Sequence, residues 1–104
     1  MYLVVFRNRK RTDIDADAYG VEAEAMERMA RAQPGFLSFK SYTAADGEVV
    51  ALSEWETEQA ARNWGRVAQH LEVQSRGREL YYESYTLFGC DAPRIHQFST
   101  KDRS

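Results

Sequence analysis

The chain has 104 residues and a formal net charge of −2, with 43% hydrophobic and 29% charged residues. The composition excludes a disordered chain, and the length suits one globular domain. The 14 basic and 16 acidic residues form no concentrated positive surface, so we expect no nucleic-acid binding. No run approaches the roughly 20 apolar residues that span a bilayer, and the N-terminal segment lacks a signal-peptide pattern. We therefore expect a cytoplasmic protein without membrane partners.

The first predicted elements are a strand and a helix. Residues 2–7 are rich in β-branched and aromatic side chains and apolar on both faces, which indicates a strand covered on both sides. Helical spacing of alanine and methionine predicts a helix over about 15–33, which Pro34 and Gly35 end. Between them lies a basic cluster that we interpret as a solvent-exposed loop: Arg7, Arg9, Lys10 and Arg11.

Two further strands and a second helix follow. Residues 36–43 and 48–55 form a predicted hairpin whose turn contains Asp46-Gly47. Thr57 is the predicted N-cap of a helix that reaches about Ser75 and ends at Gly77. Residues 80–88 form the last strand. We divide the chain into a domain over 1–88 and a tail over 89–104, which is either loose or laid on a partner.

This β-α-β-β-α-β order predicts a ferredoxin-like α+β fold with an antiparallel sheet and both helices on one face. The helices leave the other face of the sheet uncovered. Because that face also carries apolar side chains, we expect a second copy to cover it in a symmetric homodimer.

Candidate functional residues concentrate on the second predicted helix. Trp64 belongs to its core-facing stripe, whereas Asn63, His70 and Gln74 follow one flank. A free imidazole can donate or accept a proton near neutral pH, so His70 suits a ligand contact, a proton carrier or an axial metal ligand, and the alternative is a structural role at the helix edge. One histidine makes no metal-ligand set, and the single cysteine, Cys90, makes neither a disulfide nor a thiolate cluster. We predict no metal site.

Other candidates lie on the strands. Trp55 either forms a pocket wall or simply fills the sheet face. Alternation along the last strand predicts Tyr81 and Tyr85 on one face and Tyr82 on the other. Arg78 could bind an anionic ligand or pair with a carboxylate. No nucleophile motif is present, so any catalysis would depend on an apolar pocket with a few polar groups.

Three segments carry a family resemblance: Gln33-Pro34-Gly35-Phe36-Leu37, Glu54-Trp55-Glu56-Thr57-Glu58-Gln59-Ala60, and Trp64 through His70 and Gly77-Arg78 to Tyr85. Over about residues 1–88 the chain resembles the antibiotic biosynthesis monooxygenase family. The resemblance implies a dimeric α+β barrel and cofactor-free oxygenation of aromatic phenols, in which the substrate phenolate supplies electrons to O₂. Trp55 matches the tryptophan of the polyketide-oxidising members. Ala51 and Ala61 stand where those members have an asparagine and a tyrosine.

A haem-opening branch of the same superfamily uses an asparagine, a tryptophan and a histidine. Asn8 and Trp64 resemble the first two. The histidine of that branch lies ten residues after the tryptophan, where this chain has Gln74, while His70 lies six after it. The resemblance therefore implies haem as an alternative cofactor.

The leading hypothesis is a cofactor-independent monooxygenase for a small aromatic or hydrophobic compound. His70 would accept a proton, and the substrate would contact Trp55, Trp64, Asn63, Gln74, Arg78 and Tyr82. Two alternatives stay open: a haem-binding or haem-degrading monooxygenase, and a dimeric ligand-binding module without catalysis.

Overall fold

The computed structural model of the protein describes residues 1–75 and 81–102. The elements are β1 (Tyr2–Lys10), α1 (Ala16–Arg31), β2 (Phe36–Thr43), β3 (Val49–Trp55), α2 (Glu58–Ser75), β4 (Tyr82–Asp91) and the 3₁₀ helix η1 (Thr100–Asp102). Their order confirms the predicted ferredoxin-like α+β fold. Of the helices in the described ranges, none combines the length and apolar character needed to cross a membrane.

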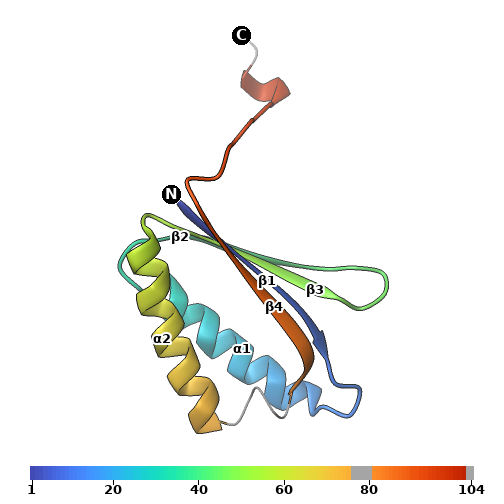
Figure 1. Cartoon of the computed structure of the whole chain (residues 1–104). Helices are drawn as coiled ribbons and strands as arrows, with labels where there is room; N and C mark the ends of the chain where they lie inside the picture. The colour runs from blue at the N-terminus through green and yellow to red at the C-terminus, as the bar shows by residue number, and fades with distance from the viewer. Residues whose placement is uncertain (76–80, 103–104) are drawn as a thin grey trace.

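The four strands form one antiparallel sheet in the order β2-β3-β1-β4, with both helices against the same face (Figure 1). We call this the helix face and the opposite one the open face. Side chains alternate between the two faces along the central strand β1. Val4, Phe6 and Asn8 therefore lie on the helix face, and Leu3 and Val5 lie on the open face.

The core lies between the helix face and the two helices. Trp55, at the end of β3, is 0% exposed and is the largest fully buried side chain of the described residues. It packs with Ala30 of α1 and Ala61 of α2, and the partly buried side chains around them are Tyr2, Val4, Phe36, Ala60 and Trp64. One tryptophan thus joins the sheet to both helices, and its burial supplies a large share of the apolar contact area.

The predicted start and end of α1 and the start of α2 have clear local causes. Asp15 caps α1 by accepting the backbone N–H of Ala18 at 3.0 Å, and Thr57 caps α2 by accepting that of Ala60 at 3.1 Å. Gly35, after α1, has φ of 83°, and an added Cβ there would lie 2.6 Å from the Cβ of Ala60. Only glycine permits this close approach between the start of β2 and α2.

The basic cluster is not the loop that the sequence suggested. Strand β1 continues to Lys10, so three of the four basic residues belong to the sheet. Arg7 and Arg9 extend to the β2–β3 hairpin, where they pair with Glu48 at 3.1 Å and Asp46 at 2.7 Å. Backbone pairing and these distant carboxylates hold a charged segment in a strand.

The predicted faces of the last strand are also wrong. Arg9 pairs with Ser84 while Lys10 pairs with Tyr82, so β4 has one extra residue at this point. Such a β-bulge reverses the alternation on one side of it. Tyr82 and Tyr85 consequently lie on the same face, with ring centroids 5.9 Å apart.

Strand β4 ends at Asp91 rather than at the predicted Phe88, so residues 89–91 belong to the sheet. The backbone N–H of Ala92 donates to the carbonyl of Met1 at 3.0 Å, after which the chain leaves the sheet and runs away from the helices (Figure 1). Ile95 and Phe98 on this arm are 56% and 70% exposed. The division into a domain over 1–88 and a tail that is either loose or laid on a partner stays a prediction.

Candidate functional site

The two tryptophans form a packed pair between β3 and α2. Their ring centroids lie 6.4 Å apart at 21° between planes, and Trp55 also meets Phe36 edge to face at 5.5 Å. The indole N–H of Trp55 donates to Ser53 Oγ at 3.0 Å. Because Trp55 is 0% exposed, it fills the helix face, the second of its two interpretations, while Trp64 stays half-buried.

The flank of α2 faces solvent. Asn63 and His70 are both exposed, and Asn63 Oδ1 accepts from Gln59 at 2.8 Å and from Arg66 at 3.4 Å. The side chain of Gln74 and all of Arg78 lie outside the described residues, as does the predicted helix end at Gly77. The described residues therefore bring Trp55 and Trp64 together but do not join them to His70 or Asn63. The role of His70 as a proton acceptor stays a prediction.

A second aromatic cluster lies on the helix face near the C-terminal end of β1. Phe6, Tyr82 and Tyr85 meet edge to face, with centroid distances of 5.7 Å, 5.4 Å and 5.9 Å. Tyr19 of α1 completes it, 6.4 Å from Tyr82 and 5.3 Å from Tyr81. Tyr82, predicted to contact substrate, is thus a member of a cluster of four residues from β1, α1 and β4.

Two polar side chains of β1 lie against this cluster. Asn8 is 3% exposed, and its Oδ1 accepts a short hydrogen bond from Lys10 Nζ. The Lys10 ammonium lies 4.8 Å from the ring centroid of Tyr19 and 5.5 Å from that of Tyr82. A cation held by a buried amide and two aromatic faces is a strong local interaction, because burial reduces its competition with water.

Tyr81 packs against the Tyr19 ring of this cluster. It is 6% exposed, and its backbone carbonyl accepts the N–H of Arg11 at 2.8 Å. Burial, followed by the negative charge of Glu22 and a hydrogen bond with it, raises the pKa of the Tyr81 hydroxyl. The raised pKa favours the neutral hydroxyl of Tyr81 as a hydrogen-bonding group.

Sequence reasoning did not place Lys10 in a site and considered Asn8 only through the haem resemblance. The signal was present in the alternation Phe6, Asn8 and Lys10, which puts all three on one face of a strand. It was hidden because the charged residues were interpreted as a loop.

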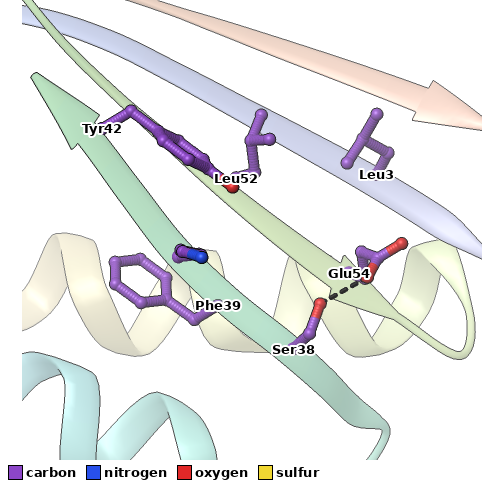
Figure 2. Close-up of a pocket in the computed structure, with 7 residues that line it drawn as sticks. Leu3, Ser38, Phe39, Tyr42, Leu52 and Glu54 are labelled. Carbon is purple, nitrogen blue, oxygen red and sulfur yellow. Dashed lines mark hydrogen bonds between the residues drawn. The ribbon is translucent and has the colours of Figure 1, made fainter.

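The open face contains a hollow of about 480 Å³ (Figure 2). Ser38 and Glu54 hydrogen-bond at its edge, and the remaining lining residues are Leu3, Phe39, Lys40, Tyr42 and Leu52. This hollow lies on the side of the sheet away from Asn8 and Lys10, so it is separate from the aromatic cluster. Within the described part of the chain, no group of three or more His, Cys, Asp or Glu side chains could hold a metal ion.

Comparison with known proteins gives this arrangement a context. The sequence profile of the family described as antibiotic biosynthesis monooxygenase matches residues 1–76. The chain belongs to the antibiotic biosynthesis monooxygenase family. This confirms the resemblance. The chain is also similar to the uncharacterized protein YqjZ of Bacillus subtilis (strain 168). The two are 35% identical over 103 residues, which cover 97% of this chain and 89% of YqjZ.

Solved structures share the fold of this monooxygenase-family protein. Rv0793 from Mycobacterium tuberculosis has a TM-score of 0.74 at 22% identity, covering 92% of this chain and 98% of its own. SnoaB, a cofactor-independent oxygenase from Streptomyces nogalater, has a TM-score of 0.70 at 20% identity, with 90% and 94% covered. The monooxygenase from ActVA-Orf6 of Streptomyces coelicolor, solved with nanaomycin D, has a TM-score of 0.66 at 24% identity, with 94% and 92% covered.

Proposed function

We propose that the protein is a cofactor-independent monooxygenase whose substrate is a small aromatic compound bound on the helix face, beside the cluster of Phe6, Tyr19, Tyr82 and Tyr85. Family membership supports the reaction class. The observation that carries the choice of site is the buried Asn8 amide, held with Lys10 among aromatic rings. Apolar walls with a few directed polar groups are typical of small-molecule sites.

The reaction needs no redox centre in the protein if the substrate is electron-rich. Loss of a proton from a phenol or an anthrone gives an anion that donates electrons to O₂. One oxygen atom enters the product as a new carbonyl, and the other leaves as water with two hydrogens from the substrate. An anthrone loses both from its reacting carbon, whereas a phenol loses one from the ring carbon and one from its hydroxyl. The protein must bind the anion, orient its reacting carbon and exclude bulk water. The aromatic cluster supplies the binding surface, and Asn8 supplies a fixed hydrogen-bonding group.

Oxygen uptake with a panel of anthrones and naphthols tests this proposal. We expect uptake above the spontaneous rate, and a decrease of roughly 100-fold in Asn8→Leu, because a preorganised polar contact to the reacting anion contributes about that factor. Leucine matches asparagine in size, and circular dichroism checks that the variant folds. No uptake above the spontaneous rate across the panel would instead favour a ligand-binding module without catalysis.

His70 is tested in the same assay. The histidine is exposed on α2, whereas Asn8 is 3% exposed on the sheet. We therefore expect His70→Ala to reduce the rate less than Asn8→Leu does. A larger loss of rate in His70→Ala than in Asn8→Leu, with a change in the acidic limb of the pH–rate profile, would support His70 as the catalytic proton acceptor.

The haem alternative fits the described residues poorly. Haem needs an axial ligand, and the candidate, His70, is exposed on α2, while the matching asparagine, Asn8, is buried on β1 against Lys10. Titration with hemin is expected to give no Soret shift that depends on His70, and a shift abolished in His70→Ala would revive this function.

We also propose that the protein is a homodimer joined through its open face. The proposal is supported by the apolar residues of this face, since a monomer would leave Phe88, which is 47% exposed, and the half-buried Leu3 and Leu52 partly in water. An isologous pairing of two such faces would cover both at once. The cytoplasmic location expected from the sequence stays a prediction.

A further inference from the structure

Lys10 differs from the other members of the basic cluster in what it contacts. Each of the three arginines has a carboxylate partner: Arg7 with Glu48 at 3.1 Å, Arg9 with Asp46 at 2.7 Å and Arg11 with Asp13 at 2.8 Å. The charges of these arginines are therefore balanced locally. The hydrogen bonds of these pairs raise the pKa of Arg9 and Arg11 and lower that of Asp13. The pKa of Asp46 is lowered first by the backbone N–H of Glu48 and then by Arg9.

The Lys10 ammonium has no carboxylate within ion-pair distance among the residues that the structure describes. Its contacts are the neutral amide of Asn8 and the rings of Tyr19 and Tyr82. An amide oxygen and aromatic faces attract a cation, but they carry no net charge that would cancel it. The helix face thus presents a positive charge on a partly buried surface, where an anion would be favoured.

We propose that Lys10 is the residue that binds the ionised oxygen of the phenolate or enolate substrate. This inference rests on the proposed function. An ammonium group has three protons, and Asn8 accepts one of them. The others can be donated to an anionic oxygen while the ring system packs against Phe6, Tyr82 and Tyr85.

The position of the cation suits this role better than a free surface lysine would. Asn8 fixes the end of the side chain, and two rings restrict it from the sides. A preorganised charge loses little conformational entropy when the ligand binds. An opposite charge within about 4–6 Å lowers the pKa of an acidic group by roughly 1–3 units. Binding beside Lys10 should therefore promote the ionisation that makes the substrate reactive toward O₂.

The test uses 4-nitrophenol, whose phenolate absorbs visible light and which therefore reports its own ionisation. Its absorbance is titrated against pH with and without excess protein. We expect the apparent pKa of the bound probe to fall by about 1 unit or more in the wild type. The decrease should be lost in Lys10→Met and in Lys10→Gln, which keeps a donor for Asn8 without the charge, and it should persist in Lys10→Arg.

Lys40→Met is the matched control. Lys40 Nζ lies 5.5 Å from the ring centroid of Tyr42, the same distance as between Lys10 and Tyr82, but on the open face. The control should leave the shift unchanged. An equal shift in folded Lys10→Gln, or no binding or shift of the probe in the wild type, would overturn the proposal. The shift of the probe requires no oxygen, so the two proposals can fail separately. A Lys10-dependent shift without oxygen uptake contradicts only the proposed oxygenase function. Oxygen uptake without the shift contradicts only the role of Lys10.

Discussion

Replacing Trp55 by alanine is expected to lower the free energy of unfolding by about 3–5 kcal/mol, the usual effect of truncating a fully buried tryptophan. The ring is 0% exposed and contacts Phe36 and Trp64. Truncation would leave a cavity between β3 and both helices and would remove the donor to Ser53 Oγ. Since domains of this size are stable by only about 5–15 kcal/mol, the variant should unfold at much lower urea concentrations.

Trp64→Ala is the control for Trp55→Ala, because it removes the same side chain from the other half of the stacked pair. Trp64 is half-buried on α2, so a smaller destabilisation is expected. Urea denaturation followed by circular dichroism measures both variants. Equal losses would contradict the assignment of Trp55 as the centre of the core and would favour its alternative interpretation as a wall of a ligand pocket.

Most of the fold could be predicted from local patterns. The spacing of apolar residues located both helices, and the caps at Asp15 and Thr57 and the Asp46-Gly47 turn marked where elements begin or reverse. The Pro-Gly-Phe motif has a structural cause, the contact between Gly35 and Ala60. The caps and the turn involve neighbours in sequence, so a short segment contains the information for each of them. The contact of Gly35 with Ala60 joins distant residues, and only the motif that marks it is local.

The site depended on contacts that no local pattern contains. Arg7 and Arg9 of β1 pair with carboxylates that lie 41 and 37 residues later in the chain. A local sequence pattern does not contain these contacts. The extra residue in β4 moved Tyr82 to the face of Tyr85, and a bulge of this kind has no strong signature in a sequence without glycine at that point. Lys10 becomes distinctive only when Tyr19 of α1 is placed over it.

Val5→Glu is expected to convert the proposed dimer into a monomer. Val5 lies at the centre of the open face, opposite Leu52 of β3 and Phe88 of β4 in the strand register. Isologous pairing would bury two copies of the new carboxylate near the interface. One uncompensated buried charge weakens association by about 3–5 kcal/mol, roughly a factor of 100 to 4,000. Sedimentation velocity at micromolar concentration measures the change.

Val21→Glu makes the same substitution on the outer surface of α1, where Val21 is 69% exposed, and should leave the assembly unchanged. A wild-type monomer, or a Val5→Glu dimer as stable as the wild type, would show that the open face is not the interface.

Val5 and Lys10 lie on opposite faces of β1, so Val5→Glu can also test whether the anion site depends on dimerisation. If the Lys10-dependent shift of 4-nitrophenol persists in the folded Val5→Glu monomer, one protomer forms the anion site alone. If the shift is lost while Val21→Glu retains it, dimerisation is needed to complete the site.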